Sequence, residues 1–280
     1  YYTATRDAAA KHHLEQSYQI LQRNAWDSTK EGYYRKLNRD LTVANTEKDF
    51  SPQLAPASGF LTYLYPITRD RRYRHQMQTI MEMAWNQMCH PQAPWIMESF
   101  TRDWQMIEGK NDAMNVGHNV EVVWLMLRLY HMTNDMAYKR YALELTKPLN
   151  TQAFHEPSGA WYHKIPIANP KMKDSSTTWW VQAYGNMTQL YLYRVTGEPH
   201  YLEQFRKGAE FWNKAFLDDE HGGTVLKAKL DGTVTKGAKA VRTKTAYHAM
   251  EHSLLNYLYL NLWVQDKPVK LHYHLENTNK

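Results

Sequence analysis

The chain has 280 residues, of which 43% are hydrophobic and 22% are charged, with 12 Gly and 11 Pro. This composition is typical of a folded globular protein and excludes a collagen-like or low-complexity chain. The formal net charge is +6, but Lys and Arg are scattered, which argues against nucleic acid as a partner because a nucleic-acid interface gathers them on one face. No apolar run approaches the ~20 residues that a transmembrane helix needs, so we expect no membrane partner.

The predicted helices show apolar residues at three- and four-residue spacing. In chain order they lie near residues 6–24, 118–132, 135–147, 179–195, 199–215 and 246–263. Segments rich in Gly, Pro and Asp, such as 218–236, predict turns and short hairpins, one of them at Leu230-Asp231-Gly232-Thr233. Residues 268–275 resemble a strand, and we expect 268–280 to form a tail.

An internal repeat of about 65 residues organises these helices. Its marker is a Thr followed two residues later by an acid, at Thr68/Asp70, Thr133/Asp135 and Thr196/Glu198. We predict a short helix–helix turn at each marker, with the Thr or the acid capping the next helix. Stacked helical hairpins form an open solenoid or a closed ring. We expect an all-α protein, an α/α toroid with about four hairpins and short β-hairpins at one end, in a single domain over 1–280.

Three polar clusters open predicted inner helices. In the first, His118 and Glu121 share one helix face, so that Glu121 can hydrogen-bond and orient the imidazole; the alternative is a histidine that caps a helix in the core. In the second, Trp179 and Trp180 are adjacent and cannot share one face of the helix. We therefore expect at least one of them to point into a cavity or into an interface between helices.

The third cluster contains His248, Glu251 and His252, which match a His-x-x-Glu-His zinc pattern. Such a site needs a third protein ligand, and the remaining chain offers only His272, His274 and Glu276. We therefore expect no metal and favour His248 as a general base. Cys89 is the only cysteine, which excludes an internal disulfide and a cysteine-rich metal site.

At these clusters the chain resembles the N-acylglucosamine 2-epimerase family, which includes cellobiose 2-epimerases and aldose–ketose isomerases. Arg102-Asp103-Trp104 and Gly117-His118-Asn119-Val120-Glu121 resemble the family's "DW…GH-D/N-I-E" block. Trp179-Trp180-Val181-Gln182-Ala183 resembles "WW-x-Q-A-E", and Lys244-x-x-Tyr247-His248 resembles "K-x-P-Y-H". The resemblance covers roughly residues 85–263.

The resemblance implies an α/α barrel of six hairpins and a sugar epimerase or isomerase that needs no cofactor. His118 and His248 would be the acid/base pair that moves a proton at C2 of an aldose through an enediol(ate), a step that imidazole suits. Glu121 would orient His118 or hydrogen-bond the sugar. Further residues expected to contact the sugar are Trp104, Trp179, Trp180, Gln182, Tyr184, Glu251, Lys244 and Gln53.

The chain departs from the family pattern in three respects. It has room for about four hairpins, Tyr184 replaces the glutamate of "Q-A-E", and the early Gln53 is not accompanied by the family's Arg. A cation would stabilise the oxyanion of the intermediate, and Lys48, Arg242 and Lys244 are candidates for it.

Two other functions stay open. One is a glycoside hydrolase or lyase on the same toroid, using carboxylates among Asp103, Asp219, Glu220 and Glu251. The other is a non-catalytic protein that binds a sugar or another partner. A homodimer also stays open. The resemblance favours the cytoplasm, whereas the start at Tyr1 without Met leaves two alternatives open, a processed secreted or periplasmic form and a fragment that is incomplete at its N-terminus.

Overall fold

The computed structural model describes residues 1–93 and 95–271. The helices are α1 (Tyr2–Thr5), α2 (Ala8–Ile20), α3 (Phe50–Pro56), α4 (Thr62–Thr68), α5 (Arg71–Gln87), α6 (Val116–Thr133), α7 (Met136–Pro148), α8 (Trp179–Thr196), α9 (Pro199–Ala215) and α10 (Tyr247–Tyr259). Four π-helical segments adjoin them: η1 (Leu21–Ala25), η2 (Ala57–Leu61), η3 (Leu149–Ala153) and η4 (Leu260–Val264). The all-α prediction is confirmed, and the six predicted helices are found with only small differences at their ends.

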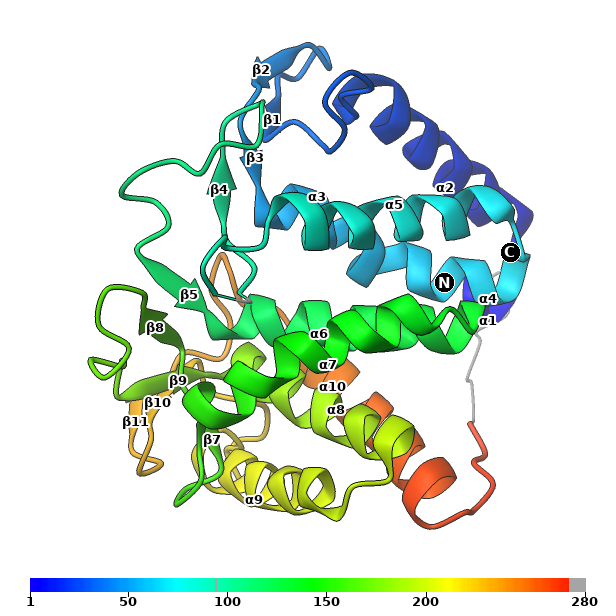
Figure 1. Ribbon diagram of the computed structural model, residues 1–280. Coiled ribbons are helices and arrows are strands. Elements are labelled where there is room, and N and C mark those ends of the chain that lie inside the picture. Colours follow the sequence, from blue (N-terminus) through cyan, green and yellow to red (C-terminus); the bar gives the residue numbers. More distant parts are fainter. Residues whose placement is uncertain (94, 272–280) are drawn as a thin grey trace.

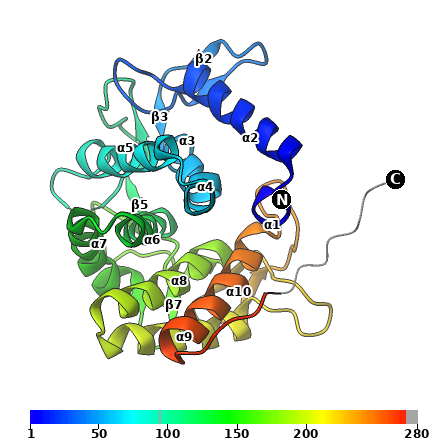
Figure 2. The same cartoon turned by 90° about the vertical axis from the view of Figure 1, so that its right-hand side faces the viewer.

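The helices alternate between the inside and the outside of an arc. The inner series is the continuous segment α3–η2–α4, then α6, α8 and α10, while α5, α7 and α9 cover them from outside (Figures 1 and 2). Helix α6 is buried on nearly all sides because α5, α7 and α8 all pack against it. Its run of Val, Leu, Met and Trp residues is apolar all round, as expected of a fully enclosed helix.

The three repeat turns have one geometry, which confirms the predicted helix–helix turn at each marker, and the predicted cap is found at two of the three. Each Thr hydroxyl donates to the carbonyl four residues earlier, and it accepts from the N–H of the acid two residues later. The residue between them is left-handed: Arg69, Asn134 or Gly197. Asp70 and Asp135 then cap the next helix through their side chains, whereas Glu198 does not.

The helix from Phe50 to Thr68 is not among the predicted ones, because proline obscures its pattern. Pro52 lies in the first turn, where proline is tolerated, but Pro56 and Pro66 lie inside the helix and have no N–H to donate. The helix widens into the π-turn η2 directly after Pro56. Residues 268–271 of the predicted strand and tail have no regular structure, and 272–280 lie outside the described residues.

Short strands precede three of the inner helices. The strands among the described residues are β1 (Lys36–Leu37), β2 (Val43–Asn45), β3 (Lys48–Asp49), β4 (Ser99–Phe100), β5 (Ala113–Asn115), β6 (Phe154–His155), β7 (Ala160–Trp161), β8 (Lys164–Pro166), β9 (Ser176–Thr178), β10 (Lys227–Lys229) and β11 (Val234–Lys236). β3, β5 and β9 run directly into α3, α6 and α8, and each pairs with a strand from another loop. The first turns of the inner helices are thereby held at one end of the molecule (Figure 1). The predicted Asp231-Gly232 hairpin is confirmed as the turn between β10 and β11.

An amide side chain at the fourth position of an inner helix recurs in three repeats. The amides of Gln53, Asn119 and Gln182 each bond both the N–H and a carbonyl of a preceding loop. Each loop is thereby attached to the helix that follows it. The amides satisfy loop backbone groups that would otherwise be buried without a partner.

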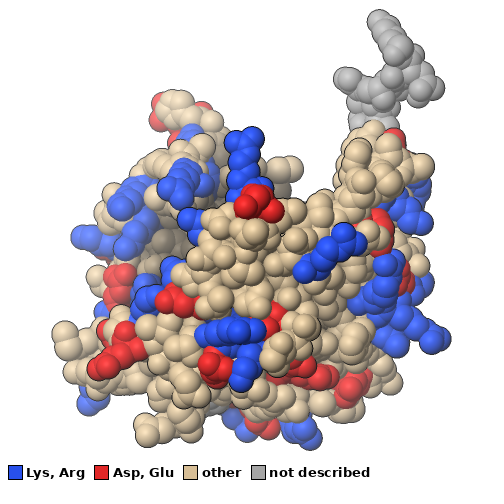
Figure 3. Space-filling model, turned by 90° about the horizontal axis from the view of Figure 1, so that it is seen from above, with Lys and Arg blue, Asp and Glu red and all other residues tan. Residues whose placement is uncertain are grey.

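Charges of both signs are interspersed on the face seen in Figure 3. This matches the scattered basic residues of the sequence. Within the described residues, no helix combines the length and the apolarity needed to cross a bilayer.

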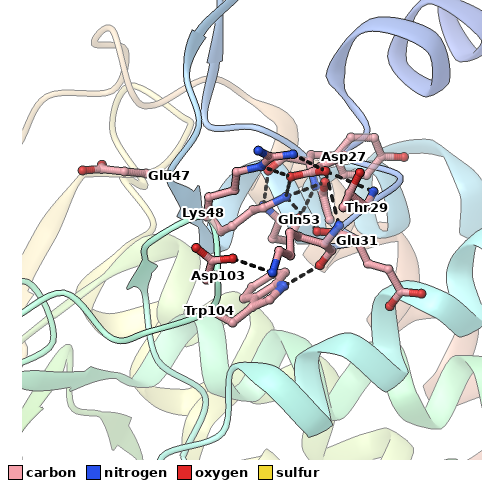
Figure 4. Close-up of polar contacts among 12 residues, drawn as sticks. Asp27, Thr29, Glu31, Glu47, Lys48, Gln53, Asp103 and Trp104 are labelled. Carbon is pink, nitrogen blue, oxygen red and sulfur yellow. Dashed lines mark hydrogen bonds and ion pairs between the residues drawn. The ribbon is translucent and has the colours of Figure 1, made fainter.

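A buried ion-pair network attaches the loop after α2 to the β3–β4 pair (Figure 4). Asp27 is only 1% exposed and lies 3.3 Å from the ammonium of the fully buried Lys48. Arg102 donates to the same carboxylate at 2.7 and 3.1 Å. Its guanidinium, together with Lys48, holds the pKa of Asp27 well below its usual range.

Asp27→Asn should lower the free energy of unfolding by about 3–5 kcal/mol, because it leaves the buried Lys48 ammonium without its carboxylate. Asp103→Asn is the matched control: it breaks the exposed Lys30–Asp103 pair and should cost less than about 1 kcal/mol. Urea denaturation measures both. Equal, small losses would mean that the buried network contributes little to stability.

Candidate active site

A cavity of about 760 Å³ lies where the first turns of the inner helices converge. Six predicted site residues line it: His118, Glu121, Trp179, Trp180, Tyr184 and His248. The rest of its lining comes from α3, η2, the loop before β8, the β9–β10–β11 sheet and the start of α10, namely Phe50, Ser51, Ala55, Ser58, Gly59, His163, Thr178, Leu226, Lys227, Lys236, Thr243 and Tyr247. Residues from four separate helical segments thus share one polar, aromatic cavity.

His118 is oriented by a residue that the sequence analysis missed. Both carboxylate oxygens of Glu98 lie 2.8 Å from its Nδ1, whereas we expected Glu121 to orient the ring. Glu98 reaches the ring because the N–H of Phe50 donates to the Glu98 carbonyl at 2.8 Å, beside the β3–β4 pair. A carboxylate only accepts, so Nδ1 carries the proton and, in the neutral ring, Nε2 is left as the proton acceptor.

Aromatic rings fix the plane of His118. Phe50 stacks on it at 3.9 Å with an interplanar angle of 12°. Trp180 is a neighbour of both histidines, because its ring centroid lies 5.1 Å from that of His118 and 6.1 Å from that of His248. The two imidazoles therefore share one indole as a neighbour.

His248 lies in an aromatic enclosure. Besides Trp180, the rings of Trp179, Tyr184 and Tyr247 lie 4.9–6.0 Å from it. Burial lowers the pKa of His248 to about 4, so the ring is neutral at pH 7. A neutral imidazole can accept a proton from a substrate.

Glu121 is the one carboxylate among the described lining residues. Burial raises its pKa to about 7, so that near neutral pH the carboxyl is partly protonated and can donate a hydrogen bond. The predicted Glu251 is not in the lining. It accepts hydrogen bonds from the hydroxyls of Tyr63 and Tyr247, and through Tyr247 it supports the cavity wall.

Four further residues predicted to contact the sugar lie elsewhere. Gln53 and Gln182 are fully buried and bind loop backbone, as described above. Lys244 donates to Thr224 and to the Lys239 carbonyl, 5.2 Å from the ring of Trp179. Trp104 donates its indole N–H to the Lys30 carbonyl on the outer side of the β3–β4 loops. None of these four side chains lines the cavity, and each has partners within the protein.

The expected oxyanion cations are also placed differently. Lys48 belongs to the buried network with Asp27, and Arg242 is exposed and outside the lining. The cations in the cavity wall are instead Lys227 and Lys236, on β10 and β11. Sequence reasoning missed them, although their places on either side of the Asp231-Gly232 turn were a usable signal.

The two histidines of the zinc pattern, His248 and His252, lie apart in the structure. His252 packs on Trp212 at 4.2 Å and contacts Asn186, away from the cavity that His248 lines. Among the described residues, no three His, Cys, Asp or Glu side chains gather in a way that could hold a metal ion. His272, His274 and Glu276 lie outside the described residues.

Comparison with known proteins finds relatives that are named as sugar epimerases and isomerases. The family model "N-acylglucosamine 2-epimerase (GlcNAc 2-epimerase)" matches residues 2–252. Cellobiose 2-epimerase of Bacteroides fragilis is 22% identical over 261 residues, which cover 89% of this chain and 65% of that protein. The chain therefore spans just under two thirds of the length of this relative.

Solved structures share the fold. Cellobiose 2-epimerase from Bacillus thermoamylovorans matches with a TM-score of 0.80 at 18% identity, covering 91% of this chain and 67% of that one. A D-mannose isomerase matches with a TM-score of 0.78 at 18% identity, covering 89% and 66%. The α/α toroid expected from the sequence is the fold of these neighbours. With a family match over nearly the whole chain, this protein belongs to the N-acylglucosamine 2-epimerase family.

Proposed function

We propose that this chain carries the acid/base site of a sugar 2-epimerase or an aldose–ketose isomerase. The observation that supports this most directly is the pair of imidazoles, His118 and His248, which line one cavity and both neighbour Trp180. Relatives named as a cellobiose 2-epimerase and a D-mannose isomerase are consistent with it. The ligand is a small-molecule sugar, and the cavity volume is in the range of small-molecule sites.

The reaction begins with removal of the proton at C2 of an open-chain aldose. His118 takes it at Nε2, because Glu98 holds the tautomer in which Nδ1 carries the hydrogen. The electron pair moves to the carbonyl and gives an enediol(ate), which Glu121 stabilises with a hydrogen bond.

The second imidazole completes the exchange. The negative charge that develops on the enediolate favours the protonated form of His248, which draws a proton from solvent and delivers it to the intermediate, while His118 releases the C2 proton to solvent. Delivery to the opposite face of C2 gives the epimer. Delivery to C1, with transfer of the hydroxyl proton from O2 to O1, gives the ketose. No electrons leave the substrate, and no redox partner is required.

The arrangement of carboxylates gives less support to a glycosidase. Glycoside hydrolysis uses two carboxyl groups roughly 5–9.5 Å apart across the scissile bond. Among the described residues, Glu121 alone supplies a carboxylate to the lining. Of the candidates, Asp103, Asp219 and Glu220 are exposed, and Glu251 is bound by tyrosines.

His118→Asn and His248→Asn should each reduce C2 proton exchange by about 10²–10⁴-fold, because each removes one acid/base group. Proton NMR in heavy water, with glucose, mannose and cellobiose, measures the exchange. Unchanged exchange in both variants would contradict the proposal. If neither variant nor wild-type protein exchanges any sugar but all bind it, the chain is a non-catalytic sugar-binding protein.

Glu98→Gln should reduce exchange by about 10–100-fold, because the amide no longer enforces one tautomer of His118. The matched control is the exposed Glu108→Gln, which removes the same charge away from the cavity. The Nδ1 and Nε2 chemical shifts of His118 report the tautomer directly. Equal activity of the two variants would show that Glu98 does not position the ring.

Gly117→Ala should lower kcat by about tenfold and stability by about 1–3 kcal/mol, because the new methyl overpacks this position. Its Cβ would lie 2.2 Å from the ring of Trp180, the indole that neighbours both histidines. Gly237→Ala is the control, since a Cβ there meets nothing within 4 Å. Unchanged kcat together with an unchanged near-ultraviolet tryptophan spectrum would contradict this packing.

A further inference from the structure

Two lysines face each other in the wall of the cavity. Lys227 on β10 and Lys236 on β11 are directly opposite in register, and Thr178 on β9 is opposite Lys227 on the other side. Figure 1 shows the three strands side by side at the start of α8. Directly opposite residues of antiparallel strands present their side chains on one face, and all three of these residues line the cavity.

This juxtaposition is unfavourable without a counter-charge. Like charges directly opposite each other destabilise an antiparallel pair. Lys227 has one loose ion pair, with Asp174 at 3.7 Å, and no hydrogen bond or ion pair joins the Lys236 ammonium to any described residue. The neighbouring Lys239 differs, because it pairs with Asp218 at 2.7 Å.

Among the described residues, the rest of the lining does not supply the missing negative charge. Glu121 lies on α6 and is partly protonated near neutral pH, as shown above. The other titratable side chains that line the cavity are the imidazoles and the tyrosine hydroxyls, together with the two lysines. A bound anion would therefore offset the repulsion between the Lys227 and Lys236 ammonium groups.

We propose that the substrate is an aldose carrying an anionic group, a phosphate or a carboxylate, at the end remote from C1 and C2. Lys227 and Lys236 bind this anion while His118 and His248 act on C2. This inference rests on the proposed function, because it assigns the substrate class of the same cavity. The two-pronged contact fits a tetrahedral or planar oxyanion, which accepts hydrogen bonds from two ammonium groups at once.

The test compares glucose, glucose 6-phosphate and glucuronate as substrates of the unmodified 280-residue protein in the heavy-water exchange assay. We expect kcat/KM for one of the two anionic sugars to exceed that for glucose at least tenfold, and whichever it is identifies the group as phosphate or carboxylate. Lys227→Met and Lys236→Met should each reduce that preference at least tenfold. Lys229→Met is the matched control, since Lys229 lies on the same strand but not in the lining.

Two results would overturn the inference. One is a kcat/KM for glucose equal to or above that for both anionic sugars. The other is an equal loss for all three sugars in the lysine variants, which would mean that the lysines stabilise the enediolate rather than select the substrate. In both cases exchange still occurs, so the proposed acid/base function stands.

Calorimetry separates this inference from the proposed function. If no sugar is exchanged, yet glucose 6-phosphate or glucuronate binds and the affinity falls at least tenfold in Lys236→Met, the anion site stands and the acid/base proposal fails. The same affinity should fall as ionic strength rises. Absence of both exchange and lysine-dependent binding would overturn both proposals.

Discussion

The hydrogen bond between the backbone N–H of Phe50 and the carbonyl of Glu98 is the contact on which the geometry of the site depends. It continues the β3–β4 pairing to the first residue of α3. The same contact brings Phe50 onto one face of His118 and the Glu98 carboxylate onto its edge. A histidine that would otherwise rotate freely is thereby fixed in plane and in tautomer by two loops distant in sequence.

That contact is one case of a rule that recurs through the molecule. A short strand leads straight into each of three inner helices, and an amide at the fourth helical position attaches a preceding loop to that helix. The first turns of the inner helices of all three repeats therefore lie at the same end of the molecule. The site is assembled from several residues of each repeat, and the remaining residues of each repeat hold those residues in place.

Burial and charge work against each other in this cavity. Desolvation keeps His248 neutral and Glu121 partly protonated, so these two lining residues carry little fixed charge. The paired lysines of β10 and β11 place positive charge at the sheet wall. The cavity thus combines an uncharged imidazole and a partly protonated carboxyl with two lysines, a combination that suits the anionic substrate proposed above.

The sequence by itself determined six of the helices, the Thr-x-acid turns and the clusters at His118, Trp179 and His248, because these depend on spacing along one chain. Only the tertiary structure decided which side chains face the cavity. Gln182 and Trp180 are two residues apart on α8, and only the tertiary contacts show that the amide binds loop backbone groups whereas the indole lines the cavity. Glu98, Lys227 and Lys236 reach the site through strand register between distant loops, and register is set by packing that no local spacing reports.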